Sequence, residues 1–258
     1  MDLRRTFDHQ AFLYDKARPH YPLDLFDKII EVTGLQTGDH LLEIGPGTGQ
    51  ATQSFAAKGF RITGVELGEH LAEVARHKLR HYPDIDIITG SFEKAELPKH
   101  EFKLVYSATA FHWIKPEVKY AKTHELLMAG GHLAIIHTNH VSDEEGDAFH
   151  VATQPIYDKY WPREGKPAPI LPKTNTLKAP DDLDEKFFKW VHFQTFPVVI
   201  DYTTEQYLEL RNTYSPTLAL PEDKRTAFLA DLGGLIDREF SGHRIKHFAM
   251  SLAIAQAK

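Results

Sequence analysis

The chain has 258 residues, of which 42% are hydrophobic and 26% are charged, as in a globular protein with a sizeable core. Its formal net charge is -6 and it has no local run of lysine and arginine, which argues against nucleic-acid binding. It has no cysteine, which excludes disulfides, thiolate metal sites and cysteine nucleophiles. The first ten residues lack the apolar stretch of a signal peptide, and no apolar run approaches a membrane span. We therefore expect a cytoplasmic protein with no membrane partner.

Helices and strands are predicted to alternate through the first half of the chain. A helix is expected after Pro22, with Gly34 as its stop. Apolar runs and helical periodicity then predict strands over 40–44, 60–65, 85–88, 102–107 and 133–137, and helices over 50–58, 69–81 and 118–128. This alternation predicts an α/β fold with a Rossmann-like, doubly wound, mostly parallel sheet. Ligands of such sheets lie beyond the carboxyl ends of the strands.

The second half has a different pattern. Residues 141–190 contain a helical stretch and a proline-rich loop, followed by a strand over 193–200, helices over 204–211 and 222–240, and a strand over 245–255. We expect a single domain, 1–258, in four parts: an N-terminal helical segment covering the site (1–33), a cofactor-binding core (34–138), a helical lid insertion that includes one sheet strand (139–220), and a helix and strand that complete the sheet (221–258).

The stretch LLEIGPGTG at the end of the first predicted strand is the strongest local signal. Gly45 and Gly47 allow a sharp turn and a close approach of the backbone to a ligand, and Gly49 allows tight packing at the start of the next helix. Glu66 ends the second predicted strand, where an acid accepts hydrogen bonds from ribose hydroxyls. Glu43 favours a ligand with an amino group. In a dinucleotide fingerprint the third glycine would lie one position later, which argues against an NAD-dependent oxidoreductase without excluding it.

This motif resembles the first motif, acid-x-G-x-G-x-G, of class I S-adenosylmethionine-dependent methyltransferases. The stretches FDH at 7–9, YDKARPHYP at 14–22 and FHW at 111–113 resemble the type 11 subgroup, which includes trans-aconitate methyltransferase-like enzymes. The resemblance covers most of the chain and is weakest over 141–190. It implies S-adenosylmethionine as the cofactor.

Carried over by this resemblance and by side-chain chemistry, the expected cofactor-binding residues are Tyr14, Arg18, Glu43, Gly45, Gly47, Gly49, Glu66, Leu67, Ser91, Phe92 and Ala108. Leu67 would pack on the adenine, and Ala108 would border the methionine end. Ser91 stands where the family often has an aspartate that accepts the adenine amino group, so Phe92 is expected to stack or to make a backbone contact instead. Arg18 suits a carboxylate of the cofactor or of the acceptor, the alternative being a solvated residue on a packed helix.

His112 follows the fourth predicted strand and is the expected catalytic residue, as a base or an acceptor-binding group. The alternative is a partly buried histidine bonded to the backbone. Tyr21 and Trp113 are expected to bind the substrate, although Trp113 also suits a packing role. The 16 histidines do not form a convincing ligand set, because His132 and His137 fall on opposite faces of a strand, and no metal site is predicted.

The resemblance therefore predicts methyl transfer to a small-molecule acceptor by in-line displacement, with a carboxylate or hydroxyl acceptor preferred because of Arg18. Two alternatives stay open. One is a protein that binds S-adenosylmethionine without catalysis, and the other is the NAD-dependent oxidoreductase.

Overall fold

The computed structural model of the chain describes residues 11–142 and 147–258, without the side chains of Ala11, Phe12 and Tyr14. The stretch 7–9, which contributed to the predicted resemblance, lies outside the described residues. The chain divides into two compact units. The first unit comprises the described residues of Met1–Pro19, His140–Thr176 and Pro197–Ala249, and the second comprises His20–Asn139, Leu177–Phe196 and Met250–Lys258.

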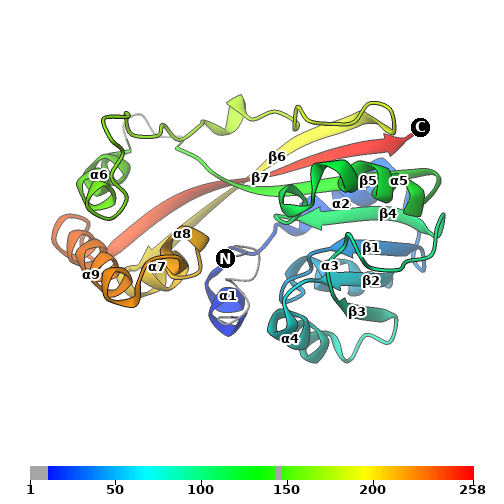
Figure 1. Cartoon of the computed structure of the whole chain (residues 1–258), viewed down its shortest axis with the longest axis horizontal. Helices are drawn as coiled ribbons and strands as arrows, with labels where there is room; N and C mark the ends of the chain where they lie inside the picture. Colours follow the sequence, from blue (N-terminus) through cyan, green and yellow to red (C-terminus); the bar gives the residue numbers. More distant parts are fainter. Residues whose placement is uncertain (1–10, 143–146) are drawn as a thin grey trace. The chain divides into compact units, whose positions relative to one another are not determined.

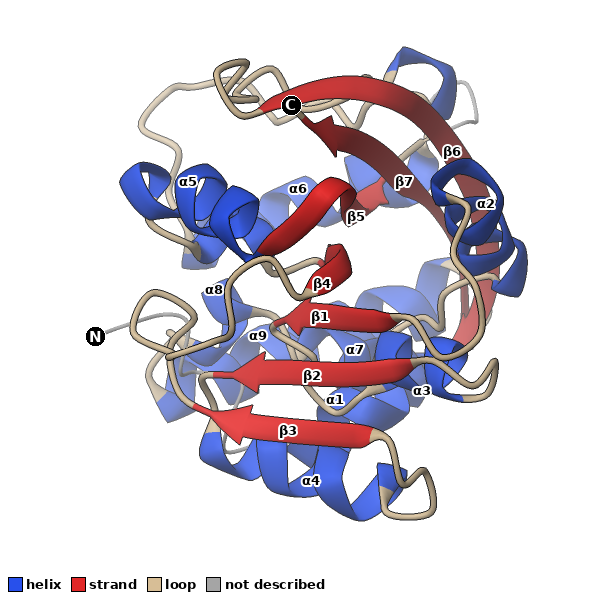
Figure 2. Cartoon of the chain, turned by 90° about the vertical axis from the view of Figure 1, so that its right-hand side faces the viewer, coloured by secondary structure: helices blue, strands red, loops and turns tan. Residues whose placement is uncertain are grey.

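One sheet has the strand order β3-β2-β1-β4-β5-β7-β6. Its strands are β1 (His40–Ile44), β2 (Arg61–Glu66), β3 (Ile85–Thr89), β4 (Phe102–Ala108), β5 (Leu127–His140), β6 (Phe188–Thr203) and β7 (His243–Ala257). Neighbours among β1 to β5 pair in parallel, and in Figure 2 the arrows of β1, β2 and β3 point the same way. The predicted Rossmann-like, mostly parallel sheet is confirmed. Because β2 and β4 flank β1, the strand order reverses at the end of β1, where such sheets bind ligands.

The helices can be followed in Figure 1. In the second unit they are α2 (Leu23–Thr33), α3 (Gln50–Ala56), α4 (Glu69–Leu79), the 3-10 turn η3 (Phe111–Trp113) and α5 (Pro116–Leu126). In the first unit they are α1 (Ala11–Ala17), α6 (Ala148–Tyr160), the 3-10 turn η4 (Thr174–Thr176), α7 (Thr204–Arg211), α8 (Ser215–Leu218) and α9 (Glu222–Glu239). No helix in the described ranges is both long and apolar enough to cross a membrane.

The second unit is built on the buried strand β1. Leu41 and Leu42 are fully buried, as expected for a central parallel strand covered on both faces. Helix α2 follows Pro22 and ends at Gly34, whose left-handed conformation (φ 65°) lets its N–H bond to the carbonyl of Ile30. The start and stop predicted for this helix are confirmed, so proline and glycine define its ends as the sequence indicates.

Strand β5 differs from its prediction. Gly130 and Gly131 were expected to close the preceding helix, but α5 ends at Leu126 and the strand begins at Leu127, before both glycines. The pairing register between β4 and β5 shifts at this point, from Phe102 with Leu127 to Leu104 with His132. Gly130 has φ 73°, so the glycines accommodate an irregular strand start rather than a helix end.

The first unit has its own apolar core. The predicted stripe of α9 buries Phe228, Leu232, Leu235 and Ile236. Phe228 and Leu232 belong to one cluster with residues of α6 and α7, among them Phe149. The short helix α8, which the sequence analysis did not predict, begins with Pro216 in its first turn.

Candidate active site

The turn between β1 and α3 contains glycines, and their lack of a side chain lets the backbone approach neighbouring residues closely. Gly45 and Gly47 have φ values of 71° and 58°, a left-handed conformation that L side chains rarely adopt. A Cβ on Gly45 would lie 2.5 Å from the Cβ of Ala110, whereas a Cβ on Gly47 would meet nothing within 4 Å. Gly45 is therefore required by packing, and Gly47 borders open space that a ligand can occupy.

Gly49 has a packing role at the start of α3. Its φ is 82°, and a Cβ there would lie 2.9 Å from Cδ1 of Leu79 at the end of α4. The third glycine thus sets the approach of α3 to α4, in agreement with the role expected for it.

Glu66, at the end of β2, holds the glycine turn. Its Oε2 accepts a hydrogen bond from the N–H of Gly47 at 2.8 Å, and its Oε1 accepts one from the N–H of Gly68 at 2.8 Å. The residue is 7% exposed. A carboxylate is also the kind of group that accepts hydrogen bonds from the two hydroxyls of a ribose.

Glu43 lies in β1 and is fully enclosed. Its Oε2 accepts hydrogen bonds from Oγ1 of Thr52 at 2.5 Å and from the hydroxyl of Tyr106 at 2.8 Å, while its Oε1 has no partner among the described residues. Burial raises the pKa of Glu43 to about 7, despite the two hydrogen bonds that favour the charged form. Because Glu43 is only 1% exposed, an amino group of a ligand could reach Oε1 only if the residues around it move.

The ends of β2 and β3 supply Leu67, Ser91 and Phe92. Leu67 and Ser91 are partly exposed, and the carbonyl of Ser91 accepts the N–H groups of Lys94 and Ala95 at 3.0 Å in a tight turn. The ring of Phe92 is buried in the core cluster, with Nζ of Lys122 5.1 Å from its centroid. Of the two roles predicted for Phe92, the backbone contact suits this placement better than stacking.

The end of β4 holds a feature that the sequence analysis missed. Ala108, a predicted cofactor neighbour, is followed by Thr109, a β-branched residue with φ 61°. Oγ1 of Thr109 is hydrogen bonded to the hydroxyl of Tyr21 at 3.2 Å and to Oγ1 of Thr138 at 3.3 Å. These contacts link Tyr21 to the strand end. The sequence carries no signal for such a backbone conformation at a threonine.

His112 and Trp113 lie in η3, directly after this strand end. The ring centroid of His112 is 4.9 Å from that of Trp113 and 5.6 Å from that of His137. Desolvation, with smaller effects of His137 and Lys119, lowers the pKa of His112 to about 4, although the side chain keeps an exposed surface. The imidazole is therefore neutral at pH 7 and can accept a proton, but it is a weak base.

Tyr14 and Arg18 belong to the first unit, whereas the other predicted site residues belong to the second. The side chain of Tyr14 lies outside the described part of the structure. Arg18 donates hydrogen bonds from Nε to Oγ1 of Thr213 at 3.0 Å and from a terminal nitrogen to the carbonyl of Thr213 at 2.9 Å. Its guanidinium also lies 4.5 Å from the ring centroid of Tyr214.

The chain matches known methyltransferases in sequence and in structure. Residues 42–135 match the model of a family described as "Methyltransferase domain". An uncharacterized methyltransferase-like protein of Schizosaccharomyces pombe is 25% identical over 258 residues, which cover 98% of this chain and 96% of that protein.

Solved structures share the fold. One is a candidate type II methyltransferase of Anaeromyxobacter dehalogenans, with a TM-score of 0.62, 22% identity and coverage of 93% of this chain and 97% of that chain. Another is phosphoethanolamine N-methyltransferase 2 of Haemonchus contortus, in complex with phosphomonomethylethanolamine and S-adenosylhomocysteine. It has a TM-score of 0.54 and 15% identity, and covers 99% of this chain and 60% of that chain.

The family match over residues 42–135 shows a class I S-adenosylmethionine-dependent methyltransferase domain in this chain. Its cofactor is S-adenosylmethionine, and the fold is the Rossmann-like fold of these enzymes. The predicted class, cofactor and fold are thus confirmed. The trans-aconitate-like subgroup stays a prediction, because none of these matches concerns it.

Proposed function

We propose that this methyltransferase acts on a small-molecule acceptor that presents a carboxylate or hydroxyl group. The cofactor-binding part of the proposal rests on one observation. The N–H of Gly47 donates a hydrogen bond to Glu66, which places an acidic acceptor beside the open space at the end of β1. The preference for an acceptor oxygen rests on the hydroxyl groups of Tyr21, Thr109 and Thr138, which lie together at the neighbouring strand end.

The residues have separate roles in this proposal. Glu66 would accept the ribose hydroxyls, Glu43 would face the amino group, and Leu67 with the Ser91–Phe92 backbone would border the adenine. Ala108, Tyr21 and Trp113 would line the methyl-transfer end. Bound S-adenosylmethionine supplies an activated sulfonium methyl group, so the protein mainly has to align the acceptor with it.

His112 is proposed to take the proton of a hydroxyl acceptor on a ring nitrogen. An ionised carboxylate acceptor would not need that step. We expect His112→Asn to lower kcat by about 100-fold with a hydroxyl acceptor and to leave a carboxylate acceptor almost unaffected. Equal loss with both would assign His112 to positioning.

The cofactor proposal is tested by calorimetric titration with S-adenosylhomocysteine, with NAD as the parallel ligand. Micromolar binding of S-adenosylhomocysteine that weakens about 100-fold in Glu66→Ala would support these roles. Glu66→Gln, which keeps one acceptor for the Gly47 or Gly68 N–H, is the matched control for the fold. Tighter binding of NAD would contradict the proposal.

The main alternative is a protein that binds the cofactor without transferring its methyl group. It predicts the same titrations but no S-adenosylhomocysteine release in the presence of any of a panel of small acids and alcohols. The division into an N-terminal cover, a core and a lid at 139–220 also remains a prediction.

A further inference from the structure

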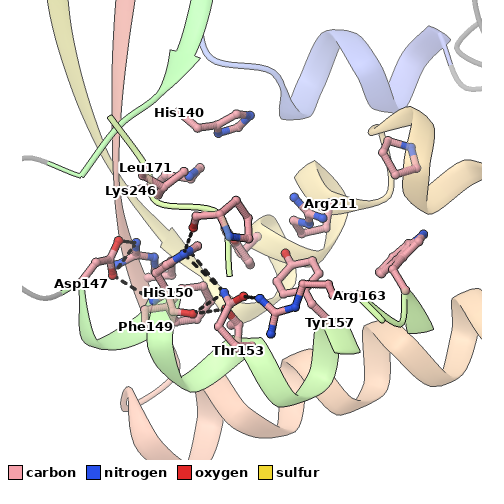
Figure 3. A pocket seen from close by; sticks show the side chains of 16 residues that line it. His140, Asp147, Phe149, His150, Thr153, Tyr157, Arg163, Leu171, Arg211 and Lys246 are labelled. Carbon is pink, nitrogen blue, oxygen red and sulfur yellow. Dashed lines mark hydrogen bonds and ion pairs between the residues drawn. The ribbon is translucent and has the colours of Figure 1, made fainter. Parts of the chain in front are cut away.

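The first unit contains a cavity of about 380 Å³ that none of the roles above uses. It is lined by residues of α6, α7 and β7 and by the loop that follows α6 (Figure 3). Its walls are largely aromatic or aliphatic, with Phe149, Tyr157, Trp161, Leu171 and Tyr207 among them. A cavity of this size and lining is typical of a site for a small organic molecule.

Two of the cations that line the cavity are neutralised by carboxylates. Arg244 pairs with Asp147 at 3.0 Å, and Arg163 pairs with Asp158 at 2.5 Å. Asp147 also accepts the N–H of His150 as the N-cap of α6. These pairs leave no described carboxylate on the cavity wall for further cations.

Arg211 and Lys246 are the cations without such a partner. Nε of Arg211 is buried and has no hydrogen bond within the described ranges, and the guanidinium lies 4.7 Å from the ring centroid of Tyr214 and 5.4 Å from that of Tyr157. Lys246 is 7% exposed, and its Nζ lies 5.0 Å from the ring centroid of Phe248. Neither forms an ion pair with a carboxylate that the structure describes.

The pKa of Lys246 shows that the positive charge on the cavity wall is poorly compensated. Burial, reinforced by Arg244 and Arg211 and opposed by Asp147, lowers the pKa of Lys246 to about 7. Leaving cations desolvated and unpaired is unfavourable, and an anion placed between them would remove that penalty. Figure 3 shows Arg211 on the helical side of the cavity and Lys246 on the strand side, so that a ligand between them would meet both.

We propose that this cavity binds a small organic carboxylate with an aromatic or aliphatic body, its carboxylate held by Arg211 and Lys246. The guanidinium fork and the ammonium group supply charge-assisted donors, and the aromatic walls cover the apolar body. The inference concerns binding alone and does not depend on methyl transfer, so its outcome is separate from that of the titrations with S-adenosylhomocysteine.

The test is calorimetric titration of the full chain with 3-phenylpropionate, phenylacetate and octanoate, each beside its uncharged amide, with and without S-adenosylhomocysteine. We expect at least one carboxylate to bind, and its amide to bind about tenfold more weakly or not at all. Lys246→Met and Arg211→Met should each weaken binding of the carboxylate about tenfold or more and leave binding of the amide unchanged. Lys224→Met, which removes an exposed lysine of the same unit, should leave both unchanged.

Thermal unfolding separates this role from a structural one. Removing an uncompensated buried charge should leave the melting temperature of ligand-free Lys246→Met equal to or above that of the wild type. Added carboxylate should raise the melting temperature of the wild type and of Lys224→Met more than that of Lys246→Met. The proposal is overturned if no carboxylate binds at millimolar concentration, if acid and amide bind alike, or if Lys246→Met binds the acid as the wild type does.

Discussion

At the scale of single residues, Glu43 shows how burial and hydrogen bonding oppose each other. Two donors, Thr52 and Tyr106, converge on one carboxylate oxygen and favour the ionised form, yet desolvation is stronger and the pKa rises. The folded protein therefore binds a proton at Glu43 more tightly than the unfolded chain does. Its contribution to stability is complete at low pH and is lost as the pH rises through about 7.

Glu43→Gln tests this directly, because the amide imitates the neutral acid and does not titrate. Relative to Glu43→Gln, the wild type without ligand should lose up to about 3 kcal/mol of unfolding free energy between the ordinary pKa of 4.5 and pH 8. Urea unfolding of both proteins at several pH values measures the difference. A difference that does not change with pH would mean that Glu43 is ionised throughout.

Thr109 stores backbone strain at the end of β4. At an ordinary strand position, a protein with glycine is less stable than one with alanine. A φ of 61° reverses this order because only glycine adopts that conformation freely. We expect Thr109→Gly to be about 1 kcal/mol more stable than Thr109→Ala. Chemical denaturation of the pair measures it, and the usual order, with alanine the more stable, would contradict the strained conformation.

At the scale of elements, the turn from β1 to α3 separates binding from packing. A Cβ on Gly47 would enter open space, whereas a Cβ on Gly49 would press on Leu79 at 2.9 Å. Both positions carry the conformational penalty of a positive φ, so they differ only in what surrounds them.

Gly47→Ala and Gly49→Ala therefore form a matched pair. Gly49→Ala should destabilise the protein by about 2 kcal/mol or more, through strain and overpacking together. Gly47→Ala should lower the stability by about 1 kcal/mol, yet it should weaken the binding of S-adenosylhomocysteine more than Gly49→Ala does. Melting temperatures and titrations on the two variants distinguish these effects, and the reverse ranking of affinities would place the ligand elsewhere.

Elements with strong local signals could be predicted from the sequence. Helix α7 has its predicted bounds because Thr203 and Gln206 form a capping box that fixes its start. The predicted start of β5 was wrong because a glycine pair after a helical pattern usually marks the helix end. Here the glycines lie inside a strand, and only the pairing with β4 shows this.

Features that arise from tertiary contacts could not be predicted in this way. Thr109 adopts its conformation through bonds to Ile136, Tyr21 and Thr138, which are distant in sequence. Arg211 of α7 and Lys246 of β7 line one cavity, and no local pattern of either segment indicates that.

At the scale of the whole molecule, the chain passes between its two units five times, after Pro19, Asn139, Thr176, Phe196 and Ala249. Strands β5, β6 and β7 each contribute residues to both units. Neither unit is a continuous segment, so the unfolding of one unit would fray the three strands that run on into the other. We expect the two units to unfold together in one cooperative transition.

Single-tryptophan variants test this cooperativity. Trp161 belongs to the first unit and Trp190 to the second, so Trp→Phe substitution at the other two tryptophans leaves one reporter in each. Their urea transitions, followed by fluorescence, should coincide with each other and with far-ultraviolet circular dichroism. Two separated midpoints would show that the units unfold independently.

The hydrogen bond between Gly47 and Glu66 has a consequence for the thermodynamics of cofactor binding. Because Glu66 already fixes the turn, the conformational entropy of ordering these glycines is lost during folding rather than when the ligand arrives. Such a preorganised turn makes association a single kinetic phase whose rate rises linearly with ligand concentration, with no slow rearrangement after the encounter.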